Sequence, residues 1–149
     1  MIFVTVGTTI PFDGLLEAVD NCVARSVIDG PVVCQIGSGE YEPKHCEWFK
    51  YQPSIQEFVN RADLIIGHGG TGTTFQLLAS DKPFISFANP LAAADHQAEF
   101  LARMASAYDI IWSRDPGELE ALLPKARDHR PKPFAEPRLH DHLKAFLLS

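Results

Sequence analysis

The 149-residue sequence predicts an α/β domain in which helices cover both faces of a parallel β-sheet. Short apolar runs alternate with helical patterns along the chain, which is the order expected when each strand is followed by a crossover helix. The runs are continuously apolar, as in strands that are buried on both faces of a sheet. The length suits one domain with a hydrophobic core, and no internal repeat divides it.

The first elements are short apolar runs and a helical pattern between them. Ile2–Val6 is a β-branched run that stops at Gly7, which predicts a buried strand. Pro11 then opens a helix, because the apolar residues that follow it are spaced three and four apart. Pro31–Ile36 is expected to be the second buried strand.

The next segment holds a polar loop and a short helix. Residues 40–47 are polar and predict a loop, and Trp48–Tyr51 predicts a short strand. Ser54 is expected to cap a helix that ends at Arg61, with Glu57 completing a capping box.

A third clear strand leads into a run of glycines. Asp63–Ile66 predicts this strand, which continues into Gly67-His68-Gly69-Gly70-Thr71-Gly72. A helix from about Thr73 to Ser80 follows, then a strand at Pro83–Phe87 and an irregular stretch over Ala88–Ala94.

The last third adds two helices and a strand before a proline-rich end. A helix is expected from Asp95 to about Ala107, a strand at Tyr108–Trp112, and a helix at Asp115-Pro116, where a cap precedes proline. We assign residues 1–130 to one domain and 131–149 to a linker with a final amphipathic helix, which packs on the same domain or docks on a partner. The linker prolines are Pro131, Pro133 and Pro137, and the apolar stripe of the helix is Leu139, Leu143, Phe146 and Leu147.

Charge and cysteine content exclude several classes of protein. The net charge of −6 argues against binding of nucleic acid or anionic membrane by the whole surface. Residues 1–124 carry 7 Lys and Arg against 16 Asp and Glu, whereas residues 125–149 carry 6 against 3. The basic end predicts either a solvated tail or an edge that faces a membrane or an acidic partner. Cys22, Cys34 and Cys46 form no CxxC pair and are odd in number, so we expect core residues and no disulfide framework or zinc site.

Ligands of parallel sheets bind at the carboxyl ends of the strands, so four loops are candidates for the site. These loops are Gly7–Pro11, Gly37–Gly39, Gly67–Thr73 and Ala88–Gln97.

The run from Gly67 to Gly72 carries the strongest chemical signal. Glycine adopts positive φ or lets a ligand come close to the backbone. The helix that follows turns its free N–H groups and positive dipole end toward the loop, and Thr71, Thr73 and Thr74 add hydroxyl donors. These features predict a diphosphate site, with a tight turn that simply requires glycine as the alternative.

Other enzyme classes fit the same residues less well. Gly67-x-Gly69-x-x-Gly72 matches a dinucleotide fingerprint, but it follows a late strand, and the next strand ends at Phe87 without the expected acid. The sequence has neither the Gly-Lys-Ser/Thr of a Walker loop nor the GxSxG elbow of a serine hydrolase. No His, Cys, Asp or Glu grouping has metal-ligand spacing, so we expect no metal site and no cofactor.

Three further groups at this edge have two interpretations each. Asp95-His96-Gln97 offers donors and acceptors to sugar hydroxyls, unless Asp95 only caps its helix. Gly7-Thr8-Thr9 either contacts phosphate or acceptor or makes a plain turn. His68 is a structural hydrogen-bonding group or a base, and with Thr8 it is a candidate catalytic residue.

Four motifs, in this order, resemble glycosyltransferase family 28. They are Val4–Phe12, Tyr51-Gln52-Pro53-Ser54-Ile55, His68–Thr73 and Asp95–Gln97. The resemblance covers roughly residues 1–112 and is to the C-terminal, nucleotide-sugar-binding half of the family. More narrowly, the motifs resemble the stand-alone subunits that serve dolichol-linked oligosaccharide synthesis in eukaryotes and polysaccharide synthesis in bacteria.

The resemblance implies a Rossmann-like domain that corresponds to the C-terminal half of a GT-B enzyme. It places Pro53-Ser54-Ile55 near a uracil, Gly69–Thr73 around a diphosphate, and Asp95–Gln97 against the sugar. Relatives usually carry a glutamate for the ribose hydroxyls where this sequence has Gln76, which is a weaker acceptor.

The resemblance also implies an activity and a partner. We expect the donor-binding catalytic subunit of a metal-independent, inverting glycosyltransferase that moves a sugar from a UDP-sugar to a polyprenyl-linked acceptor in polysaccharide or glycolipid synthesis. The acceptor site lies on a membrane-bound partner that resembles the N-terminal half, and the general base lies in this chain or in that partner. Because no basic leader or apolar stretch of ~18–20 residues is visible, we expect a cytoplasmic protein held at the inner face of the membrane by its partner. The alternative is a non-catalytic nucleotide-sugar-binding or regulatory module.

Overall fold

The computed structural model describes residues 1–132 and confirms the predicted α/β architecture. Six strands form one parallel sheet in the order β3-β2-β1-β4-β5-β6. Each strand overlaps one that the sequence predicts. The strands are β1 (Ile2–Thr5), β2 (Val32–Gln35), β3 (Glu47–Phe49), β4 (Leu64–His68), β5 (Phe84–Phe87) and β6 (Ile111–Ser113). Most of the linker and the whole final helix that the sequence predicts lie outside the described residues.

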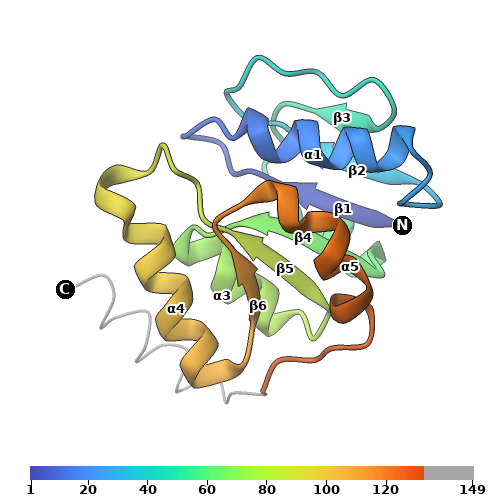
Figure 1. The fold of residues 1–149 in the computed structure, drawn as a ribbon. Coiled ribbons are helices and arrows are strands. Elements are labelled where there is room, and N and C mark those ends of the chain that lie inside the picture. Colours follow the sequence, from blue (N-terminus) through green and yellow to red (C-terminus); the bar gives the residue numbers. More distant parts are fainter. Residues whose placement is uncertain (133–149) are drawn as a thin grey trace.

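Helices cover both faces of the sheet. They are α1 (Asp13–Ala24), α2 (Gln56–Arg61), α3 (Thr71–Ala79), α4 (His96–Tyr108) and α5 (Leu119–Arg127), with short 3₁₀ helices η1 (Ala93–Asp95) and η2 (Pro116–Glu118). The helices α1 and α5 pack on one face, and α2, α3 and α4 pack on the other (Figure 1). None of the helices within residues 1–132 has the length and apolar character that crossing a membrane requires.

Two apolar layers, one on each face of the sheet, explain why the strands are continuously apolar. Val4 and Ile66 are neighbours in register on β1 and β4, and both are buried in the layer under α1 and α5. Phe3 and Ile65, one position earlier, are buried in the layer under α2, α3 and α4. Each such side chain contributes about 1.5–3 kcal/mol by leaving water.

Several predicted element boundaries are wrong, among them those of α2 and α4. The helix expected to be capped by Ser54 begins at Gln56, and Ser54 Oγ instead accepts the N–H of Gln56 at 3.2 Å, so the capping box with Glu57 does not form. Tyr108 ends α4 and does not begin a strand, because the helix continues to Asp109, whose left-handed backbone (φ 57°) stops it and whose N–H donates to the carbonyl of Ala105. The predicted cap at Asp115 is confirmed, since its Oδ1 accepts the N–H of Gly117 at 2.8 Å.

A buried carboxylate holds the loop that leads to β3. Asp20 of α1 accepts hydrogen bonds from the hydroxyl of Tyr41 at 2.6 Å, the N–H of Lys44 at 2.9 Å and the N–H of His45 at 2.8 Å. Burial raises the pKa of Asp20, but these hydrogen bonds outweigh it and hold the pKa below its ordinary value. Asp20 therefore fixes the chain just before β3 and the site residues that follow it.

The cysteines belong to the packing, as the sequence predicts. Cys22 and Cys34 are buried, Cys46 is half-buried, and all three are free thiols.

Candidate functional site

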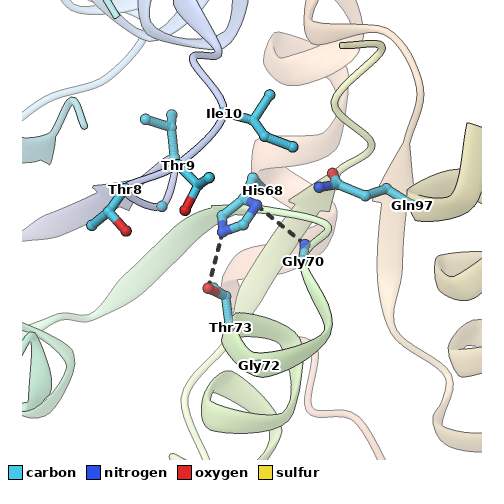
Figure 2. A pocket seen from close by; sticks show the side chains of 10 residues that line it. Thr8, Thr9, Ile10, His68, Gly70, Gly72, Thr73 and Gln97 are labelled. Carbon is cyan, nitrogen blue, oxygen red and sulfur yellow. Dashed lines mark hydrogen bonds between the residues drawn. The ribbon is translucent and has the colours of Figure 1, made fainter. Parts of the chain in front are cut away.

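Two cavities meet at the carboxyl edge of the sheet, beside the first turn of α3. We call the first, of about 260 Å³, the α4 cavity, and the second, of about 330 Å³, the β2 cavity. The α4 cavity is lined by Val6, Gly7, Thr8, Thr9, Ile10, His68, Gly70, Gly72, Thr73 and Gln97 (Figure 2). The β2 cavity is lined by Thr5, Gly7, Thr8, Gln35, Tyr51, Gln52, Pro53, Ser54, Ile55, Thr73 and Gln76. Because Gly7, Thr8 and Thr73 line both, the two cavities form one cleft across the end of α3.

The glycine-rich run is divided among three elements, which corrects its prediction as one loop. Gly67 and His68 end β4, Thr71 and Gly72 already lie in α3, and only two residues connect the strand to the helix. The helix begins two residues earlier than predicted because the backbone at Gly70 is extended (φ −65°, ψ 144°) and its carbonyl accepts the N–H and the hydroxyl of Thr74. The cleft therefore faces the first helical turn directly.

Close packing requires glycine in this run. None of its four glycines takes a positive φ. A Cβ on Gly67 would meet the Leu77 side chain at 3.1 Å, one on Gly69 would meet Leu101 at 2.6 Å, and one on Gly70 would collide with the His68 ring. At Gly72 a Cβ would meet nothing within 4 Å. The backbone of Gly72 thus borders open space on the wall of the α4 cavity.

His68 is a neutral imidazole held on both ring nitrogens. Its Nδ1 accepts the N–H of Gly70 at 3.2 Å, so the proton sits on Nε2, which donates to Thr73 Oγ1 at 3.0 Å (Figure 2). Burial lowers the pKa of His68 to about 4, which keeps the ring uncharged near neutral pH. The ring also lies against Gly7, whose φ of +76° suits glycine and where a Cβ would meet Nε2 at 2.7 Å. This geometry favours a positioning role for His68 over that of a base.

The hydrogen bond from His68 orients the hydroxyl of Thr73. Because its oxygen accepts a hydrogen bond from His68, its own hydrogen is free to point into the cleft, where Thr73 lines both cavities. The N–H groups of Thr71, Gly72 and Thr73 have no acceptor within the helix, since they belong to its first turn. Neither cavity is lined by a lysine or an arginine. An anion at this point would be held by backbone dipoles and hydroxyls.

The predicted trio Asp95-His96-Gln97 is divided by the structure. Gln97 lines the α4 cavity, and its Oε1 accepts the N–H of Asn89 at 2.8 Å, which leaves its amide NH₂ to act as a donor. Asp95 has a left-handed backbone (φ 62°) and pairs through both carboxylate oxygens with Arg114 at 2.7 and 2.8 Å. His96 is exposed and lines neither cavity. Asp95 does stand at the N-cap position of α4, as the alternative expects, but its side chain makes no capping hydrogen bond.

Most of the remaining predicted residues lie at the β2 cavity. Pro53-Ser54-Ile55 forms part of its wall, and Gln76 reaches it from α3. The Nε2 of Gln76 donates to Gln56 Oε1 at 3.4 Å. Gly69 and Thr71 line neither cavity: Gly69 packs against Leu101, and Thr71 is the first residue of α3.

Sequence reasoning missed several residues of the cleft. Thr5, Val6, Ile10, Gln35, Tyr51 and Gln52 line it without having been proposed as site residues. Gln35 had a detectable signal, because it is a lone amide at the end of an otherwise apolar buried strand. Within residues 1–132 no three His, Cys, Asp or Glu side chains are placed to hold a metal ion.

A parallel sheet in this order, with a cleft over its carboxyl edge at a helix N-terminus, defines a Rossmann-like α/β domain. The model of the glycosyltransferase family 28 C-terminal domain matches residues 1–145, and the chain belongs to this family. Its fold is that of the C-terminal half of a GT-B glycosyltransferase, as the sequence predicts.

Known proteins support this assignment. The mouse (Mus musculus) UDP-N-acetylglucosamine transferase subunit ALG13 is 33% identical over 113 residues, which cover 68% of this chain and 10% of that protein. The crystal structure of Acinetobacter baumannii MurG superposes with a TM-score of 0.65 at 18% identity and covers 97% of this chain and 52% of that one. The NMR structure of ALG13 gives a TM-score of 0.62 at 19% identity over 95% of this chain and 93% of that one. The chain thus matches only about a tenth of the length of its mouse relative.

Proposed function

We propose that this domain is the donor-binding part of an inverting glycosyltransferase and that it holds a UDP-sugar in the cleft of the α4 and β2 cavities. The observation that carries the proposal is the position of the first turn of α3 between the two cavities. A UDP-sugar has the same order of parts: a nucleoside, a central diphosphate and a hexose. The mouse relative is named for a donor of this class.

The diphosphate belongs at the first turn of α3. The N–H groups of Thr71, Gly72 and Thr73, the hydroxyl of Thr73 and the positive end of the helix dipole all favour negative charge there. Such fixed dipoles also stabilise the charge that develops on a leaving diphosphate. We therefore propose that transfer needs no metal ion, and activity should persist in excess EDTA. Loss of activity in EDTA with rescue by magnesium or manganese would contradict this assignment.

The nucleoside belongs in the β2 cavity and the hexose in the α4 cavity. Pro53-Ser54-Ile55 and Gln76 border the first, and the free amide NH₂ of Gln97 borders the second. A hexose hydroxyl can accept from that NH₂ group. Thr8 and Thr9 lie on the opposite side of the α4 cavity from Gln97, where an incoming acceptor would approach (Figure 2).

We propose that the acceptor is polyprenyl-linked and is held by a second, membrane-bound protein that resembles the N-terminal half of a GT-B enzyme. The fold matches about half of the MurG chain, and the mouse relative is named a subunit. Because both ring nitrogens of His68 are engaged, we place the general base on that partner. The pair would act at the cytoplasmic face of the membrane in polysaccharide or glycolipid synthesis.

The test combines binding with transfer. Calorimetry of the full chain should show binding of UDP and of UDP-N-acetylglucosamine. Transfer of a radiolabelled sugar to lipid should appear only when membranes that contain the partner are added. Absence of UDP binding would refute the donor role, and robust transfer by the purified chain alone would refute the need for a partner. Binding without transfer in the presence of the partner would favour a non-catalytic module.

A further inference from the structure

One buried side-chain oxygen on the wall of the β2 cavity has no hydrogen-bond partner. The side chain of Gln35 is 3% exposed, and its Oε1 is enclosed without a donor. Two other enclosed side-chain oxygens of the described chain share this condition, on Asp13 and Ser86, and neither residue lines the β2 cavity. Native proteins pair nearly all buried polar groups, because an unpaired one costs stability. The unpaired oxygen of Gln35 therefore points to a ligand that pairs with it when the ligand is bound.

The fold places this amide at the binding edge of the sheet. Gln35 is the last residue of β2 and lies in register with Thr5 of β1. Both side chains are on the face under α2 and α3, because Phe3 and Val33, two positions earlier, are buried there. Gln35 thus lines the β2 cavity from a strand that β1 separates from β4, the strand that leads into α3.

The donor and acceptor atoms of the amide determine which chemical groups can pair with it. A glutamine side chain presents an acceptor oxygen next to a donor NH₂, and neither is charged. A phosphate has acceptors only and would leave the oxygen unpaired. The imide edge of a uracil presents N3–H next to a carbonyl oxygen, which pairs with both atoms at once. The last torsion of a glutamine side chain is broad, so the amide can turn into the required plane.

We propose that Gln35 recognises the base of the bound nucleotide: its Oε1 accepts from N3–H of uracil, and its Nε2 donates to the adjacent carbonyl. This assignment rests on the proposed binding of a UDP-sugar, and it names the residue that reads the base. It makes Gln35 a specificity-determining residue that costs the free protein some stability.

The test uses UDP and N3-methyl-UDP, which lacks the imide hydrogen, as probes in calorimetry with the full chain. Wild-type protein should bind UDP more tightly than the methylated probe. Gln35→Met removes the amide with little change in side-chain length. Loss of two neutral hydrogen bonds should weaken UDP binding roughly 5- to 150-fold, and the variant should lose its preference for UDP over the methylated probe. Its melting temperature should stay the same or rise, because the unpaired amide is gone.

A matched control and four possible results test the assignment. Ser86→Ala removes another enclosed, unpaired oxygen from the same sheet outside both cavities, and it should keep wild-type UDP affinity. Equal binding of both probes by the wild-type protein overturns the assignment without any variant. So does unchanged UDP affinity in Gln35→Met, or weakened affinity with the preference for UDP intact. If the wild-type protein binds neither probe, the proposed function itself fails.

Discussion

Protonation of His68 in the unfolded chain should lower the free energy of unfolding across the mildly acidic range. Burial lowers the pKa of His68 from 6.5 to about 4, so the unfolded chain takes up this proton first as the pH falls. The stabilising contribution is therefore complete above about pH 6.5 and is lost between there and about pH 4. A difference of about 2.5 pKa units, at about 1.4 kcal/mol each, amounts to roughly 3 kcal/mol of unfolding free energy.

The measurement is urea unfolding of the wild-type protein and His68→Gln at a series of pH values from 7.5 to about 4.5. Wild-type protein should lose roughly 2–3 kcal/mol more than the variant over this interval, since the variant has no such proton to bind. The imidazole resonances of His68 should report a neutral ring at pH 5.5. His96→Gln removes an exposed ring at the start of α4 and should keep the wild-type pH profile.

Two results would refute the reasoning about His68. One is a titration midpoint of its ring near 6.5, which would mean that burial does not penalise the charged form. The other is a parallel pH dependence of wild-type protein and His68→Gln. In either case the ring would not be the fixed donor that orients the hydroxyl of Thr73 toward a diphosphate.

Three further predictions concern the cleft and its support. Gly70→Val should lower UDP affinity at least tenfold in calorimetry while the far-UV spectrum stays native. The control Gly14→Ala, at a position where a Cβ meets nothing, should keep the wild-type affinity. Equal affinities of Gly70→Val and the wild-type protein would mean that the glycine run only makes a turn. Gln97→Ala removes the free amide donor, so UDP-sugar binding should weaken roughly 2- to 13-fold with UDP binding nearly unchanged. An equal loss for both ligands would place this residue at the nucleotide. Asp20→Asn should lower the unfolding free energy in urea by about 2–3 kcal/mol, and Asp29→Asn, at an exposed position, should lower it by much less.

Local patterns were sufficient to predict the sheet and its helices. A strand buried on both faces needs an unbroken apolar run. The buried residues of the central strands, such as Phe3 on β1 and Ile66 on β4, belong to runs of this kind. The errors arose at the ends of helices and strands, where the conformation of the adjoining residues sets the boundary. Tyr108 has a side chain typical of strands, but α4 continues through it and stops at the left-handed backbone of Asp109. The helix after β4 starts at Thr71 because the extended backbone of Gly70 ends the connection early.

The sequence by itself determined the fold class and the loops that form the binding edge, because these follow from periodicity and from glycine and threonine at strand ends. Pro53-Ser54-Ile55 and Gln76 were expected at the cleft only from the family resemblance. Only the tertiary structure decided what each side chain there can do. It turns Asp95 toward Arg114, engages both nitrogens of His68, ties Gln97 to Asn89 and leaves the side-chain oxygen of Gln35 unpaired. Burial and most of these partners depend on strands and loops that are far apart in the chain, and the parallel crossovers bring them to one edge.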